Sequence, residues 1–201
     1  MTIAVVLADD EGLIRTALAT LLPLEGDIAV VAEAADGHEA LAAFAEHRPD
    51  VLVLDMEMPG IDGLEAASAV LADHPQQAIL MLTRHARPGT LRRALKLGVR
   101  GFLGKHSAPD TIAEAIAHVA TGGRHVDPSV SAQALIDDCP LTERELDVLR
   151  VASDGYSVAD IARILHLAPG TVRNYLSSAI GKTHTTTRHD AARYAREQGW
   201  I

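Results

Sequence analysis

Short apolar runs alternate with amphipathic helical patterns over residues 1–122 of the chain. The runs are continuously apolar, which is typical of strands buried on both faces of a parallel sheet. Helical patterns lie between these runs, and a further helical pattern follows the last run. This last pattern places Ile112, Ile116 and Val119 on a single face. Repeated strand–helix units predict a doubly wound α/β domain with right-handed crossovers. Five strands are expected, at residues 3–8, 29–32, 51–54, 78–82 and 101–103.

This rhythm changes after residue 122. Pro128 and the segment Asp137-Asp138-Cys139-Pro140 predict a linker over residues 123–139. No strand pattern follows, and residues 140–201 predict a small all-α domain of four helices. Thr142 and Glu145 have the spacing of a capping box that opens the first of these helices. The third helix begins near Pro169, where proline suits a first turn.

Charge separates the two halves of the chain. The 201 residues carry a formal net charge of −9, but residues 1–125 hold 10 basic and 17 acidic residues, which gives −7. Residues 126–139 add −3, and residues 140–201 hold 8 basic and 7 acidic residues, which gives +1. From Arg163 onward the net charge is +4. An acidic N-terminal part followed by a basic C-terminal end is expected when the C-terminal end binds phosphates and the N-terminal part has a different function.

The expected location of the protein is the cytoplasm, with no membrane partner. No apolar run approaches the roughly 20 residues that span a bilayer. No basic segment precedes the first apolar stretch, which argues against a secretory signal. Cys139 is the single cysteine, so an internal disulfide is excluded.

Polar residues follow the expected strands at the points where each strand ends. Because the carboxyl ends of parallel strands meet at one edge of a sheet, these residues should converge on one site. Three crowded carboxylates repel one another unless a cation lies between them, and all-oxygen ligands indicate Mg²⁺. The residues concerned are Asp9, Asp10, Asp55, Thr83 and Lys105.

These residue types suit phosphoryl transfer to a carboxylate. Asp55 is the expected nucleophile, which would become an aspartyl phosphate. Lys105 would hold phosphoryl oxygens as a mobile point charge. Thr83 would donate its hydroxyl to another oxygen, and Mg²⁺ would neutralise charge on the incoming group.

The third helix of the second domain has the pattern of a recognition helix. A helix, a tight turn and an amphipathic helix are typical of a helix-turn-helix. Val172, Leu176 and Ala179 form its inward stripe, so Arg173 and Asn174 face outward, where they suit guanine and adenine. The candidate DNA-binding residues are Thr171, Arg173, Asn174, Ser177, Lys182 and Arg188. A solvated face on a purely structural helix remains the alternative.

The first domain resembles the flavodoxin-like receiver domain of two-component response regulators. The resemblance rests on Asp9-Asp10, Asp55-Met56-Glu57-Met58-Pro59-Gly60, Thr83 and Lys105, and it covers residues 1–122. It implies that a sensor histidine kinase phosphorylates Asp55. It implies that Asp10, Asp55 and the backbone carbonyl of Glu57 bind Mg²⁺, with Asp9 helping through water. Phe102 matches the switch aromatic of the family, although a plain core residue is an equal reading.

The second domain is similar to the LuxR/FixJ-type DNA-binding domain. With the receiver in front, the chain resembles the NarL subfamily, and details such as Ala86-Arg87-Pro88-Gly89 and the Gly199-Trp200 ending are most similar to DesR-like regulators. The resemblance implies binding to double-stranded promoter DNA as a homodimer formed on phosphorylation, with RNA polymerase as a candidate partner. The motifs are Leu141-Thr142-Glu143-Arg144-Glu145, Gly155-Tyr156-Ser157, Ile161-Ala162 and Pro169 to Ser177.

The chain departs from the family pattern at several positions. Arg84 stands after Thr83, where a small residue is usual, which puts the lifetime of the acyl phosphate in question. His106 replaces the usual proline after the lysine, so a cis peptide is not assumed there. Ala168 replaces a capping serine at the start of the recognition helix, at an expected loss of about 1 kcal/mol. Thr183 and Thr187 replace a usual leucine and a usual asparagine, which is expected to loosen the last helix junction.

Three alternatives to a phosphorylated regulator remain open. An aspartate-based phosphatase or phosphotransferase would also use an aspartyl phosphate and Mg²⁺, and Glu57 sits where such enzymes place an acid/base. The DNA-binding pattern and the lack of a cap insertion argue against an enzyme. A protein-interaction switch and a phosphate-independent regulator are the others. Strong salt dependence of duplex binding would distinguish a DNA-binding regulator from a protein-interaction switch. The complete set of aspartates, threonine and lysine argues against a phosphate-independent regulator.

Overall fold

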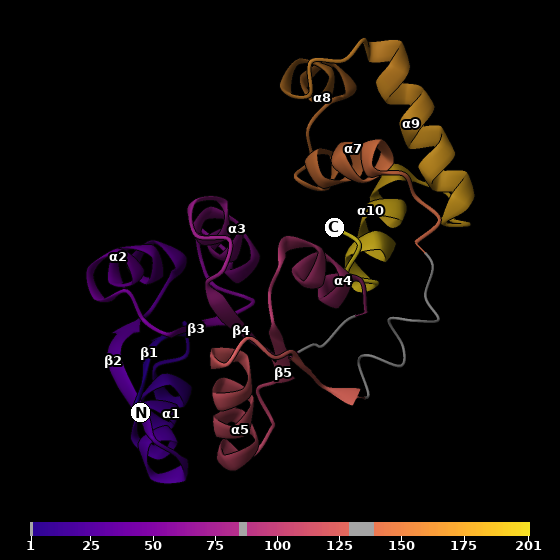
Figure 1. Cartoon of the computed structure of the whole chain (residues 1–201). Coiled ribbons are helices and arrows are strands. Elements are labelled where there is room, and N and C mark those ends of the chain that lie inside the picture. The colour runs from indigo at the N-terminus through magenta and orange to yellow at the C-terminus, as the bar shows by residue number, and fades with distance from the viewer. Residues whose placement is uncertain (1, 85–87, 129–138) are drawn as a thin grey trace. The chain divides into compact units, whose positions relative to one another are not determined.

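The computed structural model describes residues 2–84, 88–128 and 139–201 (Figure 1). The chain divides into two compact units, one built on a β-sheet and the other on the helices that follow residue 138. Most of the expected linker, residues 129–138, and the segment 85–87 lie outside the described residues.

The sheet of the first unit is parallel throughout, with the strand order β2-β1-β3-β4-β5-β6 in the part of the chain that is described. The five expected strands are confirmed. A sixth short strand, which the sequence analysis assigned to the linker, pairs with β5. The strands are β1 (Ile3–Ala8), β2 (Ile28–Ala34), β3 (Val51–Asp55), β4 (Ala78–Thr83), β5 (Gly101–Gly104) and β6 (His125–Val126).

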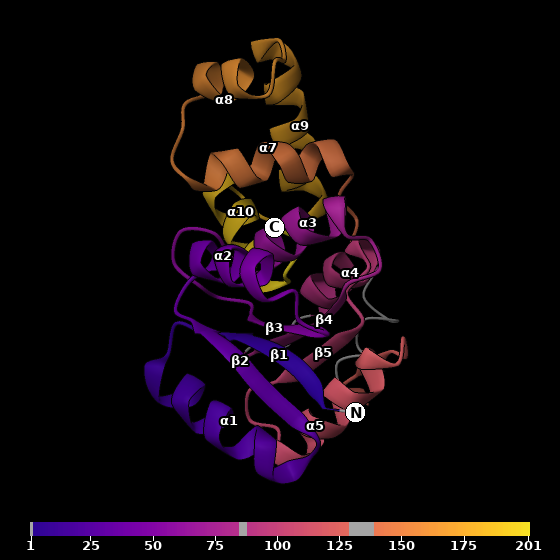
Figure 2. The same cartoon turned by 60° about the vertical axis from the view of Figure 1, so that its left-hand side comes forward.

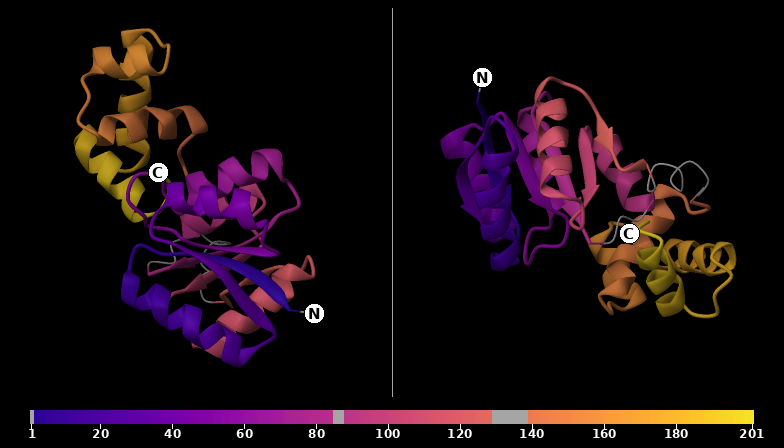
Figure 3. Two further views of the ribbon diagram at one scale, coloured as in Figure 1. Left: turned by 90° about the vertical axis from the view of Figure 1, so that its left-hand side faces the viewer. Right: turned by 90° about the horizontal axis from the view of Figure 1, so that it is seen from below.

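Helices cover both faces of this sheet, as the doubly wound prediction required. Figures 2 and 3 show α1 and α5 on one face and α2, α3 and α4 on the other. The continuous apolar runs are explained by this layering, because Val5, Val6, Leu7 and Ala8 of β1 are all fully buried. The helices are α1 (Gly12–Glu25), α2 (Gly37–His47), α3 (Gly63–Asp73), α4 (Pro88–Leu97) and α5 (Pro109–Ala120).

One glycine fixes the path of the chain after β3. Gly63 begins α3, and its N–H donates to the carbonyl oxygen of Met56 at 3.1 Å. A Cβ at Gly63 would collide with the backbone carbonyl oxygen of Asp55. Only glycine therefore lets α3 start this close to the end of β3. The turn after Asp55 is held tightly as a result.

The second unit is a small bundle whose described helices are α7 (Glu143–Ser153), α8 (Val158–Ile164), α9 (Pro169–Lys182) and α10 (Arg188–Glu197). The capping box of Thr142 and Glu145 is confirmed. Ala168 precedes α9 without a side-chain cap, as expected. Thr187 does cap α10, because its hydroxyl accepts from the Asp190 N–H at 3.1 Å.

The core of this bundle takes one apolar face from each helix. Val172, Leu176 and Ala179, the expected inward stripe of α9, are buried. Thr183 is also buried, and its hydroxyl donates to the carbonyl oxygen of Ala179 at 2.8 Å. Its polar group is therefore satisfied, and so the expected loosening has no support at Thr183 or Thr187.

Within the described ranges, no helix is long and apolar enough to cross a membrane.

Candidate phosphorylation site and DNA-binding surface

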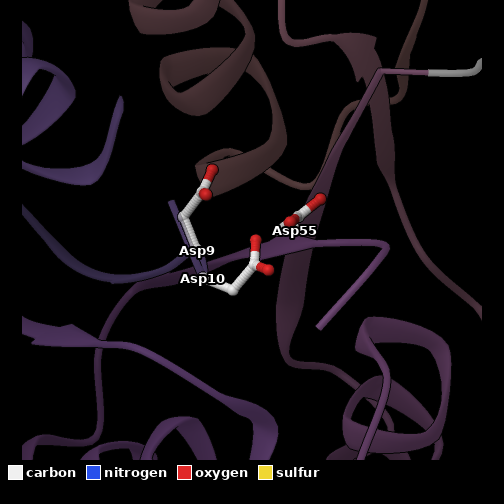
Figure 4. Close-up of side chains that lie close together, drawn as sticks. All are labelled: Asp9, Asp10 and Asp55. Carbon is white, nitrogen blue, oxygen red and sulfur yellow. The ribbon is translucent and has the colours of Figure 1, made fainter. Parts of the chain in front are cut away.

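The sheet brings the expected polar residues together at one edge. Asp9 and Asp10 directly follow β1, and Asp55 is the last residue of β3. Thr83 ends β4, and Lys105 follows β5, where its N–H donates to the carbonyl oxygen of Thr83 at 2.8 Å. Figure 4 shows the carboxylates of Asp9, Asp10 and Asp55 side by side. The convergence inferred from strand ends is therefore what the backbone produces.

The three aspartates form a compact oxygen cluster. One carboxylate oxygen from each of Asp9, Asp10 and Asp55 lies within 4.8 Å of the others. Asp9 and Asp55 are 0 % and 2 % exposed, whereas Asp10 is exposed and gives the cluster an opening to solvent. Such a set of oxygens at the mouth of a pocket matches the ligand preference of Mg²⁺.

Lys105 supplies the positive charge inside the pocket. Its Nζ lies 2.8 Å from Asp55 Oδ2 and 2.9 Å from Asp9 Oδ2, and its side chain is 5 % exposed. Asp9 Oδ2 has this ion-pair contact but no hydrogen bond. One ammonium group thus faces two buried carboxylates, which leaves the pocket short of positive charge.

The pKa values of the two buried carboxyl groups reflect their burial. Burial raises the pKa of Asp55 to about 6, although the hydrogen bond and charge of Lys105 act to lower it. Burial also raises the pKa of Asp9, again against the effect of Lys105. A divalent cation at the cluster would favour the charged forms, so the residues present fit Mg²⁺.

Thr83 and Phe102 lie inside the domain on the neighbouring strands β4 and β5. Both are fully buried, and Phe102 pairs with Met81 across β4 and β5. The Glu57 N–H donates to Asp55 Oδ1 at 3.2 Å, which orients the carboxylate. Glu57 itself has an exposed side chain. No cis peptide bond occurs in the described part of the chain, so the bond between Lys105 and His106 is trans.

Glu11 is a site residue that the sequence analysis missed. Its carboxylate lies 3.0 Å from Lys105 Nζ through Oε1. The same carboxylate receives two hydrogen bonds from Arg84, one of them from Nε to Oε1 at 2.9 Å and the other from Nη2 to Oε2. The available signal was an acidic residue directly after Asp9 and Asp10, at the end of the same strand.

The second unit presents α9 as an exposed helix behind a tight turn. Arg173, Asn174 and Ser177 are exposed, while Thr171 is half-buried in the first turn of α9. Arg188, at the start of α10, is also half-buried. The face opposite the buried stripe therefore carries the side chains expected there.

Lys182 differs from these residues because its ammonium group already has a partner. Its Nζ lies 2.8 Å from Glu145 Oε2 and 3.0 Å from Glu145 Oε1. Ser178 Oγ donates to the same carboxylate at 2.6 Å, and the Thr142 N–H donates to it at 2.6 Å. Glu145 is 3 % exposed and so ties the start of α7 to the recognition helix. One of the candidate DNA-binding residues is thus engaged within the domain.

These contacts determine the ionisation of Glu145. Burial alone would raise its pKa, but hydrogen bonds from Lys182, Ser178 and Thr142 outweigh burial and lower the pKa to about 2. Glu145 is therefore charged at neutral pH. Both polar centres of the protein are thus built on a buried carboxylate facing a lysine.

Family models match both units. Residues 5–117 match the response regulator receiver domain, and residues 139–195 match the bacterial regulatory proteins of the luxR family.

Two similar proteins match nearly the whole chain. The uncharacterized transcriptional regulatory protein YvfU of Bacillus subtilis is 40 % identical over 195 residues, covering 97 % of this chain and 98 % of that protein. The transcriptional regulatory protein DesR of Bacillus subtilis is 39 % identical over 199 residues, covering 99 % of each.

A solved structure has a similar arrangement of elements. The two-component response regulator RcsB, in a structure described as an RcsB–DNA complex, superposes with a TM-score of 0.69 and 26 % identity. That match covers 98 % of this chain and 99 % of RcsB. The DesR-like details of the sequence agree with the likeness to DesR, although Ala86 and Arg87 lie outside the described residues.

Proposed function

The chain belongs to the response regulators that join a receiver domain to a LuxR-type DNA-binding domain, and we propose that phosphorylation of Asp55 controls its binding to promoter DNA. The phosphoryl group comes from a sensor histidine kinase in the cytoplasm. The phosphorylated protein dimerises and then regulates transcription, with RNA polymerase as a candidate partner. Residues 1–122 act as the receiver and residues 140–201 as the DNA-binding domain.

The observation that carries this proposal is the setting of Asp55. Its carboxylate is 2 % exposed, belongs to the three-aspartate cluster and lies 2.8 Å from an ammonium group. A carboxylate used only to cap a helix has no need of a buried lysine or of two further aspartates. Nucleophile, cation ligands and charge-neutralising lysine are together what phosphoryl transfer requires.

Asp9, Asp10, Asp55 and the backbone carbonyl of Glu57 would hold Mg²⁺. When bound, the ion neutralises charge on the transferring phosphoryl group. Asp55 attacks the phosphorus of the kinase phosphohistidine, and the phosphorus–nitrogen bond breaks. The imidazole nitrogen keeps the electron pair, and the ring leaves as neutral imidazole because its other nitrogen already carries a proton. Lys105 then holds phosphoryl oxygens, and Thr83 donates its hydroxyl to another.

Phosphorylation replaces the single negative charge of the Asp55 carboxylate with about −2 on the phosphoryl group, a net addition of about −1 to a pocket that already lacks positive charge. Thr83, Lys105 and the neighbouring Phe102 rearrange to accommodate it, which reshapes the surface of the domain. Two faces are candidates for dimerisation, one formed by α1 and α5 and one running from α4 through α5. Leu13 and Leu24 of α1 favour the first, because they are 86 % and 75 % exposed and lie eleven positions apart on one helix face.

In the DNA-binding domain, Arg173 and Asn174 read base edges in the major groove. Thr171, Ser177 and Arg188 contact the sugar–phosphate backbone. Lys182 contributes less to phosphate binding, because Glu145 already pairs with its ammonium group. A two-fold dimer would place two copies of α9 on half-sites about 10 bp apart.

The LuxR-type match favours this function over an aspartate phosphatase, which would have no use for a recognition helix. Incubation with Mg²⁺ and acetyl phosphate, followed by intact-mass measurement, tests the phosphorylation site. The wild-type protein should gain one phosphoryl group, and Asp55→Asn should gain none. An undiminished adduct on Asp55→Asn, or continuous turnover of a small phosphoester, would contradict the proposal.

A further inference from the structure

We propose that Arg84 is a second cation for the phosphoryl group on Asp55, which Glu11 holds until phosphorylation releases it. The inference rests on the proposed phosphorylation of Asp55 and concerns how long that phosphorylation lasts. Arg84 and Glu11 would then set the lifetime of the aspartyl phosphate, a role that is separate from those of the aspartate cluster and Lys105.

The carboxylate of Glu11 is shared between two cations at the mouth of the pocket. Its Oε1 lies 3.0 Å from Lys105 Nζ and 2.9 Å from Arg84 Nε, while its Oε2 accepts from Arg84 Nη2. The same Lys105 Nζ lies 2.8 Å from Asp55 Oδ2. One ammonium group thus joins Glu11 to Asp55, which places the Arg84–Glu11 pair next to the reacting carboxylate.

The exposure of these side chains allows them to exchange partners. Lys105 is 5 % exposed, but Glu11 and Arg84 are 27 % and 56 % exposed, so both lie on the solvent side of the pocket. An exposed ion pair of this kind has little stability of its own. Glu11 and Arg84 can therefore separate without disturbing the buried part of the site.

A phosphoryl group on Asp55 competes with Glu11 for its cations. The phosphoryl group carries about −2 in place of the single charge of the free Asp55 carboxylate, and it has three acceptor oxygens, whereas Glu11 carries one negative charge. The phosphoryl group also repels Glu11, because both are negatively charged and lie close together on either side of Lys105. The guanidinium group of Arg84 matches phosphate oxygens through paired N–H donors. Arg84 therefore moves from Glu11 to the phosphoryl group once Asp55 is modified.

This exchange slows hydrolysis of the aspartyl phosphate. In hydrolysis a water oxygen attacks phosphorus, and the bond between phosphorus and the Asp55 oxygen breaks. Its electron pair returns to the Asp55 carboxylate, and both water protons leave with inorganic phosphate. The attacking water must enter from the solvent side, where the guanidinium group of Arg84 stands when it binds the phosphoryl oxygens.

The test compares the lifetime of the phosphorylated protein in a double-mutant cycle. The wild type, Arg84→Ala, Glu11→Gln and the double variant are phosphorylated with acetyl phosphate and Mg²⁺, freed of donor and followed by intact mass. Arg84→Ala should shorten the half-life about tenfold, which corresponds to about 1.4 kcal/mol. Glu11→Gln should lengthen the half-life, because Arg84 no longer has a competing partner. Arg124→Ala removes the same charge from an exposed site after α5 and should leave the half-life unchanged.

The double variant decides between Arg84 and other causes. It should match Arg84→Ala alone, because Glu11 acts on lifetime through Arg84. Half-lives that are equal in all variants, or shortened in both single variants, overturn the inference while leaving phosphorylation of Asp55 intact. Lengthening by Glu11→Gln that persists without Arg84 overturns it too. A wild-type protein that forms no adduct refutes the proposed function itself.

Discussion

Glu145→Gln is a sharp test of how the DNA-binding domain is held together. The substitution keeps the size of the side chain but removes the charge that faces Lys182. It also weakens the hydrogen bonds that the carboxylate accepts from Ser178 and from the Thr142 N–H. We expect α7 and α9 to lose part of their attachment, while the apolar core between them remains.

The magnitude follows from the ionisation of Glu145. Its pKa falls from an ordinary value of 4.5 to about 2 in the folded protein. A depressed folded-state pKa stabilises the fold above the unfolded pKa, and that stability is lost as the pH falls toward the folded pKa. The shift corresponds to a contribution on the order of 3 kcal/mol at neutral pH, which disappears between about pH 5 and pH 2.

Trp200 provides the assay within the full chain. It is the only tryptophan of the protein and is 5 % exposed in the core of the second unit, so its fluorescence reports unfolding of that unit. Urea titrations should give Glu145→Gln a free energy of unfolding lower than wild type by about 1–3 kcal/mol at pH 7. The difference should shrink as the pH approaches 3.

Glu143→Gln is the matched control, because it removes an exposed carboxylate from the same turn of α7. Its effect should stay within about 0.5 kcal/mol at all pH values. A difference between wild type and Glu145→Gln that is absent at pH 7, or that is constant from pH 7 to pH 3, would refute the assignment of this stability to the charged carboxylate.

The remaining predictions concern DNA reading and dimerisation. Arg173→Ala should cost about 1–3 kcal/mol on a cognate duplex and blunt discrimination against altered sites, which binding to both duplexes across a salt series would measure. Lys182→Ala should reduce the slope of that salt series by less than about one, because Glu145 already neutralises the ammonium group; a full unit would contradict this. Leu13→Glu should abolish phosphorylation-dependent dimerisation in sedimentation, whereas Leu97→Glu on α4 should not, and the reverse pattern would favour the α4 face.

The sequence predicts the fold and the aspartate pocket because both depend on simple periodic rules. Continuous apolar runs indicate strands buried on both faces, and parallel strands carry the residues at their carboxyl ends to one edge. Asp55 and Thr83 are the last residues of β3 and β4, so locating the strands also located the site. The two-residue strand β6 was missed because His125 and Val126 are too few to form a pattern.

The contacts that the sequence did not reveal join polar residues distant along the chain. Arg84 and Glu11 are 73 residues apart, and Lys182 and Glu145 are 37 apart. No periodicity links such pairs, because their meeting depends on how whole elements pack. The capping box did identify Glu145, but only as a partner of Thr142 within its own turn.

The central claim is that phosphorylation of Asp55 governs DNA binding. The most direct measurement is a footprint on a promoter fragment selected by the phosphorylated protein, with and without acetyl phosphate and Mg²⁺, for wild type and Asp55→Asn. Wild type should protect paired half-sites spaced about 10 bp at lower protein concentration when phosphorylated, and Asp55→Asn should show no response. Equal protection in all four conditions, or an equal response of Asp55→Asn to acetyl phosphate, would contradict the account.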